Sequence, residues 1–196
     1  MLIVTLAGGI GSGKSTVAAA LAECGARLLS LDDVARDVLS PGEEAVREVG
    51  DLWPEAVREG KIDRAALARI VFDDAAALAR LNAVVHPRTW ERAQAQLASW
   101  REESLQAQSA REFVVVVELA LLAGSPYQDA YHGTIVVDAP EDVRVLRLVD
   151  SRGMDEADAR ARIASQTPAS RVRELADVVV DNGGSLEDAA RAAREL

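Results

Sequence analysis

The sequence opens with a glycine-rich segment whose residue types and spacing are suited to binding phosphate. Residues 8–15, Gly-Gly-Ile-Gly-Ser-Gly-Lys-Ser, place Gly8 and Gly13 on either side of four residues and follow Gly13 with Lys14 and Ser15. Glycines let successive backbone N–H groups point at phosphate oxygens, and the start of the next helix adds partial positive charge. Lys14 would reach the β- and γ-phosphates of a nucleotide, and the Ser15 hydroxyl would ligate Mg²⁺. The predicted contacts to the nucleotide are Gly8, Gly9, Gly11, Ser12, Gly13, Lys14, Ser15 and Thr16.

The alternative for this segment is a glycine-rich turn that only joins a strand to a helix. A predicted strand over 2–6 and a predicted helix from about Lys14 flank the segment, as the binding mechanism requires. These flanks favour the phosphate-binding interpretation. They do not choose between a kinase, a GTPase and a mechanical ATPase.

Acidic residues follow two of the predicted strands. Asp32, beside Asp33, comes directly after a strand over 27–30. Because the carboxyl ends of parallel strands line one crevice, such a carboxylate would face the phosphates and accept a proton from a substrate hydroxyl or hold Mg²⁺ indirectly. An equally open reading is that Asp32 or Asp33 caps a helix over 34–39. Glu118 raises the same question on weaker grounds, since many strand ends carry an acid.

Arginines gather late in the chain, between 144 and 173. Arg147, Arg152 and Arg162 could close over a nucleotide and neutralise the charge on the transferring phosphoryl group, so we expect a mobile lid over about 145–166. The alternative for any one of them is a surface salt bridge with the acids of the same stretch.

The elements that must position these residues alternate between short apolar runs and helical patterns. Runs over 2–6, 27–30, 113–117 and 134–138 lack polar alternation, as strands buried on both faces do, and 176–181 is a fifth candidate before a Ser185-capped helix. We therefore predict a three-layer α/β/α fold with a five-stranded parallel sheet. The sheet would be formed by residues 1–40 and 112–196.

Residues 41–111 differ in character. Strand patterns are missing, and Leu67, Ile70 and Val71 recur at helical spacing. Asp63 is a predicted helix N-cap, and Pro87 is predicted in the first turn of a long helix that reaches Gln108. We expect an inserted helical domain.

Composition narrows the class of protein. The 196 residues are 49% hydrophobic and 28% charged, and no apolar stretch approaches the roughly 20 residues of a membrane-spanning helix. A net charge of −10 disfavours nucleic acid as a partner. Without a basic, apolar leader the chain is expected in the cytoplasm. The single cysteine, Cys24, excludes an internal disulfide and is expected to be a buried thiol.

Five segments resemble, in order and spacing, the dephospho-coenzyme A kinase family. They lie at 5–15, at 32–36 with Pro41-Gly42, and at 81–87, 162–166 and 176–184. The resemblance implies a P-loop kinase that uses ATP and Mg²⁺ to phosphorylate the ribose 3′-hydroxyl of dephospho-coenzyme A, the last step of coenzyme A synthesis. It also implies a small-molecule acceptor as partner, and we expect a monomer.

The resemblance further implies roles for individual residues. Asp32 matches the catalytic base, Lys14 and Ser15 the phosphate and Mg²⁺ contacts, and Arg147 and Asn182 positions near the adenine of ATP, with Arg147 also catalytic. The helical insertion matches an acceptor-binding domain, and the implied acceptor contacts are Asp32, Arg36, Arg64, His86, Glu118 and Arg162. For His86, a purely structural role at a helix start before Pro87 is the alternative.

The chain departs from the family pattern at three places. Ser30-Leu31-Asp32 stands where the family has Asp-x-Asp, and 118–124 lacks the proline and the final acid of Asp-Ile-Pro-Leu-Leu-Phe-Glu. Ser151-Arg152 replaces an Arg-Asp pair, which makes Arg147 and Arg162 better lid candidates than Arg152. Two other functions therefore remain open: a kinase for another small hydroxyl acceptor, such as a nucleoside or sugar acid, and an ATP-binding regulatory protein without turnover.

Overall fold

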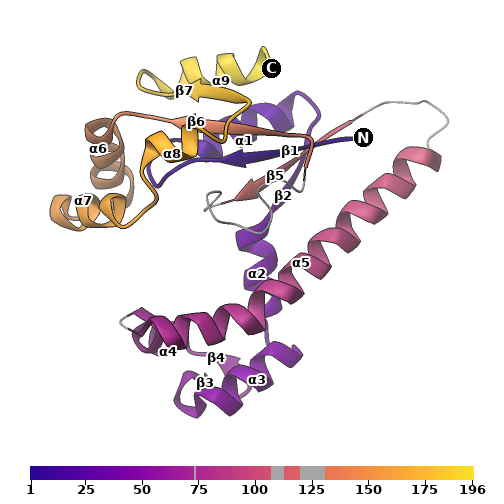
Figure 1. Cartoon of the computed structure of the whole chain (residues 1–196), viewed down its shortest axis with the longest axis vertical. Coiled ribbons are helices and arrows are strands. Elements are labelled where there is room, and N and C mark those ends of the chain that lie inside the picture. Colours follow the sequence, from indigo (N-terminus) through magenta and orange to yellow (C-terminus); the bar gives the residue numbers. More distant parts are fainter. Residues whose placement is uncertain (73, 107–112, 120–130) are drawn as a thin grey trace. The chain divides into compact units, whose positions relative to one another are not determined.

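The computed structural model describes residues 1–72, 74–106, 113–119 and 131–196 (Figure 1). Contacts divide the chain into two compact units, Met1–Ser30 with Ala107–Leu196, and Leu31–Gln106. We call them the sheet unit and the helical unit. The helical unit begins ten residues before the predicted boundary at 41, because the helix after residue 30 packs on the long helix of that unit.

The sheet unit alternates strands with helices, as the sequence predicts. Its described elements are β1 (Leu2–Ala7), α1 (Lys14–Glu23), β2 (Arg27–Ser30), β5 (Val114–Leu119), β6 (Gly133–Asp138), α6 (Glu141–Arg152), α7 (Glu156–Ala164), α8 (Ala169–Arg173), β7 (Val178–Asp181) and α9 (Leu186–Arg194). The five strands are parallel, in the order β2-β5-β1-β6-β7. The predicted five-stranded parallel sheet is confirmed, and each strand begins and ends within two residues of its predicted bounds.

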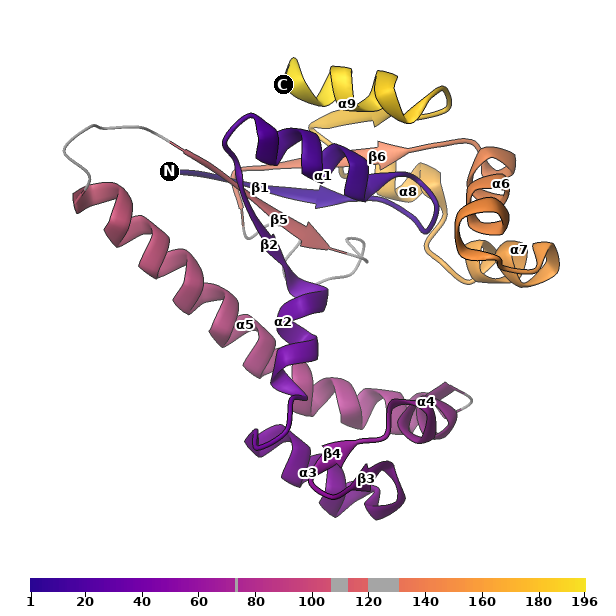
Figure 2. The same cartoon turned by 180° about the vertical axis from the view of Figure 1, so that it is seen from behind.

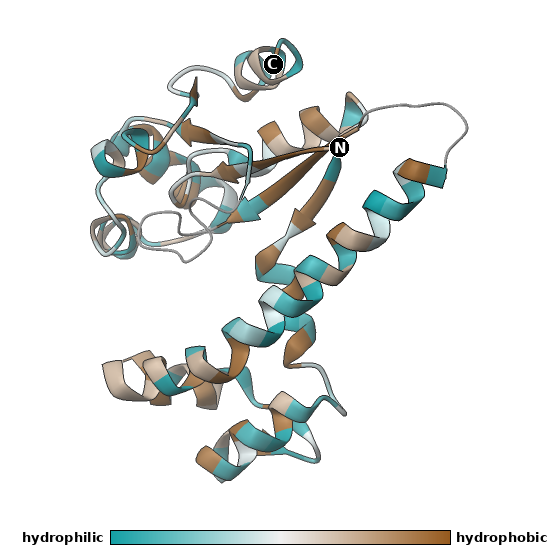
Figure 3. Ribbon diagram, turned by 45° about the vertical axis from the view of Figure 1, so that its right-hand side comes forward, coloured by the Kyte–Doolittle hydropathy of each residue, from teal (hydrophilic) through white to brown (hydrophobic). Residues whose placement is uncertain are grey.

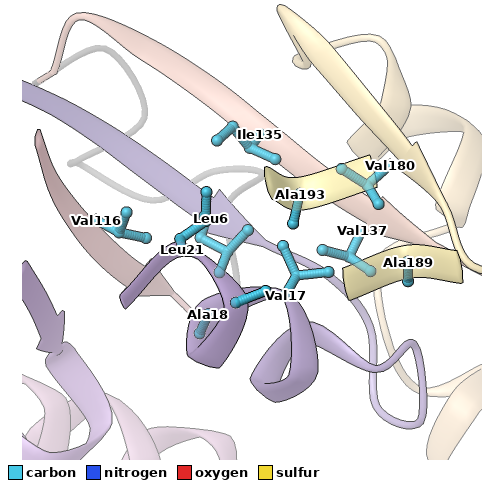
Figure 4. Close-up of a cluster of buried hydrophobic side chains, with 11 residues drawn as sticks. Leu6, Val17, Ala18, Leu21, Val116, Ile135, Val137, Val180, Ala189 and Ala193 are labelled. Carbon is cyan, nitrogen blue, oxygen red and sulfur yellow. The ribbon is translucent and has the colours of Figure 1, made fainter. Parts of the chain in front are cut away.

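The strands form because their side chains are apolar and mostly β-branched, and the sheet is covered by helices (Figure 3). Val115, Val116 and Val117 of β5 are completely buried. Leu6 and Val137 pack with residues of α1 and α9 in one hydrophobic cluster (Figure 4). The short helix α8 contacts β6, and Figures 1 and 2 show it on the other side of the sheet from α1.

The register brings the carboxyl ends of the strands to one edge of the sheet. Ser30 of β2 pairs with Glu118 of β5, and Ala7 of β1 pairs with Leu119. At β6 and β7, Asp138 pairs with Asp181. The glycine-rich segment leaves β1 at the same edge. Binding sites in open parallel sheets lie at this edge.

The helical unit has its own hydrophobic core. Its described elements are α2 (Leu31–Val38), α3 (Glu44–Leu52), a 3₁₀ helix (Pro54–Ala56), β3 (Val57–Arg58), β4 (Lys61–Ile62), α4 (Arg64–Phe72) and α5 (Ala75–Gln106). Val38, Val49 and Leu67 lie in one buried cluster with Val84 and Val85. The insertion is helical, as predicted.

The expectation of a strand-free insertion is wrong, because β3 and β4 form a small antiparallel hairpin. Glu59 and Gly60 make its turn, with φ values of 51° and 72°. Two positive φ values match the tight hairpin turn that suits twisted strands. Strands of two residues carry no alternation, so the pattern could not reveal them.

The predicted place of Pro87 is also wrong. Pro87 lies inside α5 and not in its first turn, and His86 is therefore not at a helix start. Proline removes one backbone donor from the helix. Two side chains just after it also bond carbonyl groups of the preceding turn: Arg88 Nη1 donates to the Val84 oxygen and Thr89 Oγ1 to the Val85 oxygen, both at 2.9 Å.

Two predicted helix caps are confirmed. The Asp63 carboxylate accepts from the Ala66 N–H at 3.0 Å, and the Ser185 hydroxyl accepts from the Asp188 N–H at 3.1 Å. Neither Asp32 nor Asp33 is an N-cap as predicted, because α2 begins at Leu31 and both acids lie within its first turn.

Two further expectations concern exposure. Cys24 is exposed and not buried, because it lies just beyond α1. Among the helices of the described residues, none combines the length and the apolar character needed to cross a bilayer.

Candidate active site

The glycine-rich segment forms a compact loop between β1 and α1. The Ser12 N–H donates to the Gly9 oxygen at 3.1 Å, and the Thr16 N–H donates to the Gly13 oxygen at 3.0 Å. Gly13 is left-handed, with φ 87°, and a Cβ added there would lie 2.1 Å from Asn182 Nδ2. Only glycine fits at this position, on grounds of both backbone conformation and space.

Asn182 and Arg147, both predicted nucleotide contacts, lie together beside this loop. Asn182 is 1% exposed, and its Nδ2 donates to the Ser12 oxygen at 2.7 Å. Arg147 Nη2 donates to the Asn182 oxygen at 2.9 Å and to the Gly184 oxygen at 3.0 Å. The turn after β7, the helix α6 and the end of the loop are thus joined by hydrogen bonds.

The side chain of Lys14, the first residue of α1, reaches the end of β5. Its Nζ donates to the Leu119 oxygen at 3.1 Å and is 3.9 Å from Glu118 Oε2. Glu118, predicted as an acceptor contact, therefore neighbours the lysine of the loop. The remainder of the altered stretch, 120–124, is outside the described residues.

The oxygen donors near Lys14 fit a magnesium ion. The Ser15 hydroxyl is exposed in the first turn of α1, and Glu118 supplies a carboxylate at the neighbouring strand end. Over the described ranges, no cluster of three or more His, Cys, Asp or Glu could hold a metal ion. Mg²⁺ at kinase sites takes one or two protein oxygens and completes its shell with phosphate oxygens and water, so the donor set here is adequate.

Asp32 is the second residue of α2, and its side chain is exposed. It follows Ser30, the last residue of β2, by two positions in the chain. Its neighbour Asp33 is paired with Arg36. The two acids of this turn therefore differ in their partners, although both belong to the helical unit.

Three of the predicted acceptor contacts line one groove within the helical unit. Arg36 of α2, Arg64 of α4 and His86 of α5 lie around it, and its volume is about 310 Å³. The apolar part of its lining comes from Ala35, Leu39, Leu81 and Val85. Two guanidinium groups and an imidazole beside an apolar surface suit a ligand that is partly anionic and partly apolar.

The other two arginines of the predicted lid lie on the surface. Arg162 and Arg152 are exposed at the ends of α7 and α6. Arg160 makes ion pairs with Glu141, Asp142 and Glu156. Arg160 was not one of the three arginines predicted to close over the nucleotide.

Two residues of the site were missed by sequence reasoning, Arg144 and Gln166. Arg144 is 7% exposed, and its Nε donates to the Ile10 oxygen of the loop at 2.8 Å. Burial lowers the pKa of Arg144, and the nearby Asp138 and Glu141 carboxylates act in the opposite direction. The available signal was an arginine on the same face of α6 as the buried Val145 and Leu148.

Comparisons with known proteins agree on one family. The family model for dephospho-CoA kinases matches residues 2–188. The dephospho-CoA kinase of Thermobifida fusca is 43% identical over 190 residues, which cover 96% of this chain and 90% of that protein. The dephospho-CoA kinase of Corynebacterium jeikeium is 40% identical over 188 residues, with 95% and 93% covered.

Solved structures show the same fold. A crystal structure from Thermus thermophilus has a TM-score of 0.83 and 37% identity, and the match covers 99% of this chain and 95% of that one. A dephospho-CoA kinase structure from Campylobacter jejuni has a TM-score of 0.70 at 23% identity, covering 98% and 94%. At 23% identity, the similarity to the Campylobacter jejuni structure is evidence for the fold alone.

Proposed function

The chain belongs to the dephospho-CoA kinase family, and from that premise we propose how its own residues carry out the ATP-dependent final step of coenzyme A biosynthesis. The observation that carries the proposal is the joined arrangement of the loop, Lys14, Arg147 and Asn182 at the carboxyl edge of the sheet. Backbone N–H groups of the loop hold the phosphates of ATP, together with the N-terminus of α1. The proposed contacts are the predicted ones, Gly8, Gly9, Gly11, Ser12, Gly13, Lys14, Ser15 and Thr16, and Ile10 is not among them.

Lys14 and Arg147 supply positive charge to the nucleotide. Lys14 exchanges the Leu119 oxygen for the β- and γ-phosphates, because a phosphate oxygen is a stronger acceptor than a carbonyl. Arg147 and Asn182 lie beside the adenine, and the Arg147 guanidinium offsets charge on the transferred group. Both residues already contact the loop backbone at Ser12.

Asp32 acts as the general base. The ribose 3′-oxygen of dephospho-coenzyme A bonds to the γ-phosphorus, the bond from that phosphorus to the ADP oxygen breaks, and the hydroxyl proton passes to the Asp32 carboxylate. Two observations support this role. The Asp32 side chain is exposed directly after β2, and Asp32 is not the N-cap of α2.

The groove of the helical unit binds the acceptor. Dephospho-coenzyme A carries a diphosphate between its adenosine and pantetheine parts, and Arg36 and Arg64 are suited to that diphosphate. His86 lines the same groove. Glu118 and Arg162 complete the predicted acceptor contacts.

Magnesium would be held by the Ser15 hydroxyl. The ion, when bound, neutralises charge on the β- and γ-phosphates. The net charge of −10 disfavours nucleic acid as a partner. A cytoplasmic location and a monomeric state complete the proposal.

The test is an acceptor panel with ADP release as the readout. The purified protein is incubated with ATP, Mg²⁺ and, separately, dephospho-coenzyme A, a nucleoside and a sugar acid. We expect ADP release that depends on dephospho-coenzyme A and is lost in Lys14→Met. Release with another acceptor would support a different small-molecule kinase, and ATP binding without acceptor-dependent release would support the regulatory alternative.

A further inference from the structure

Ile10, in the first half of the loop, has both backbone polar groups bound by side chains from far along the chain. Its N–H donates to Gln166 Oε1 at 2.9 Å, and its oxygen accepts from Arg144 Nε at 2.8 Å. Arg144 Nη2 also donates to Gln166 Oε1 at 2.8 Å. The three residues form a closed set of hydrogen bonds that we call the Ile10 joint.

The side chain of Ile10 is held by the same two helices. It packs against the hydrophobic cluster of α6 and α7, whose buried members are Val145, Leu148, Ala159 and Ile163. Arg144 lies in α6, and Gln166 follows the end of α7. Backbone and side chain of one loop residue are therefore both bound by the α6–α7 pair.

The glycines on either side of Ile10 allow this close approach. A Cβ at Gly9 would lie 2.5 Å from Arg144 Nη2 and 3.0 Å from Gln166 Oε1. A Cβ at Gly11 would lie 2.8 Å from the Arg144 oxygen. The first half of the loop thus rests directly on α6, with no space for a side chain between them.

We propose that Arg144 and Gln166 are positioning residues that fix the phosphate-binding loop to the α6–α7 pair, so that nucleotide binding and the state of α6–α7 are energetically coupled. The predicted lid, 145–166, is bounded by these two residues. A displacement of α6–α7 must either carry Ile10 with it or break the joint. The inference rests on the proposed function only for the identity of the nucleotide.

The first test compares variants with unbranched, uncharged side chains that cannot make the hydrogen bonds of the joint. In Arg144→Met and Gln166→Met, we expect the Kd of a non-hydrolysable ATP analogue to rise about tenfold, since each leaves partly buried hydrogen-bond partners unsatisfied. The KM for dephospho-coenzyme A should stay within about twofold, because its proposed contacts lie elsewhere. The double variant should bind about as weakly as either single variant, since both act through one backbone residue.

Two controls separate the joint from general packing. Arg160→Met removes the ion pairs with Glu141, Asp142 and Glu156 without touching the loop, so its affinity for the analogue should match wild type. Arg144→Lys keeps a donor near the Ile10 oxygen and should restore part of the lost affinity. Equal weakening of both substrates in the folded Met variants, or unchanged affinity for the analogue, would overturn the proposal.

Hydrogen exchange of the wild-type protein provides a test that needs no variant. The Ile10 amide should be protected without nucleotide, because Gln166 accepts its hydrogen. The ATP analogue should slow exchange in α6 and α7 as well as in the loop, since coupling is reciprocal. An unprotected Ile10 amide, or no change in α6–α7 on binding, would contradict the coupling. The Kd of the ATP analogue and the hydrogen exchange use nucleotide binding alone, so a failed acceptor panel leaves these two measurements interpretable.

Discussion

Asp32 and Asp33 are adjacent acids in the first turn of α2, and only one of them is assigned to proton transfer. We expect Asp32→Asn to lower kcat by about 10²- to 10⁴-fold, the usual range for a general base, while the Kd of ATP changes less than about twofold. Steady-state kinetics and calorimetric ATP titration measure the two quantities.

Asp33→Asn is the matched control for that prediction. It removes the same charge from the same helix turn, so both variants lose a similar interaction with the helix dipole. If kcat falls equally in both, the effect belongs to the helix and Asp32 is not the base.

Gly13 has a left-handed backbone conformation, and the absence of a side chain there leaves room for Asn182. In Gly13→Ala we expect the free energy of unfolding to fall by about 1–3 kcal/mol, and ATP affinity to fall at least about tenfold, because the new methyl group would displace Asn182. Gly25→Ala is a suitable control, since Gly25 has a similar φ of 98° with nothing within 4 Å of the added Cβ. ATP affinity near wild type in a folded Gly13→Ala would contradict the role given to this contact.

At the scale of the elements, hydrogen-bonded carboxylates at two helix N-termini make the stability of the fold fall at low pH. The pKa of Asp63 is lowered, chiefly by the Ala66 N–H, and the pKa of Asp188 is lowered by the Ser185 hydroxyl. A lowered pKa stabilises the fold above the unfolded value of 3.8, and the contribution is lost as pH falls below it. We expect urea midpoints to drop as the pH falls below about 4, and less steeply in Asp63→Asn. Parallel curves for the variant and wild type would contradict the assignment.

The long helix α5 tolerates a proline in its interior. Pro87→Ala restores a backbone donor, and we expect the free energy of unfolding to rise by roughly 1–3 kcal/mol. Pro54→Ala provides the comparison, because Pro54 opens a 3₁₀ helix, where a missing N–H costs little. Urea unfolding measures both. A lower midpoint for Pro87→Ala would mean that the proline shape itself is required.

Sequence patterns predicted the elements that are marked by a continuous apolar run or by local capping residues. The sheet strands are apolar at almost every position and were located within two residues, and the caps at Asp63 and Ser185 follow from local chemistry. The β3–β4 hairpin was missed because two-residue strands have no period. Pro87 was misplaced because helical spacing continues on both sides of it.

The candidate site was predictable where a motif is continuous in sequence. The nucleotide contacts between Gly8 and Thr16 were predicted from the motif alone. The family resemblance supplied Arg147 and Asn182, which lie together in the structure. The joint of Ile10 with Arg144 and Gln166 depends on contacts across 134 and 156 positions. Local patterns cannot contain that information.

At the scale of the whole molecule, the two units have separate hydrophobic clusters. Leu67 is 5% exposed within the cluster of the helical unit. We expect Leu67→Ala to lower the free energy of unfolding by about 2–5 kcal/mol. At denaturant concentrations where the variant stays folded, the Kd of ATP should be unchanged, because all proposed nucleotide contacts belong to the sheet unit. Denaturant unfolding and calorimetry provide the data.

Val17→Ala is the counterpart in the sheet unit, where Val17 of α1 is completely buried. It should lower both stability and ATP affinity, since α1 begins at Lys14. Loss of ATP affinity in a folded Leu67→Ala would show that nucleotide binding depends on the core of the helical unit.

The exposed Cys24 is the sole cysteine in the sequence. It lies just past the last residue of α1, a ten-residue helix that starts at the phosphate-binding loop, and a helix of that length spans about 15 Å. A maleimide fluorophore would therefore attach at one known place, away from the triphosphate, without prior removal of other thiols. The natural protein is ready for single-dye spectroscopy.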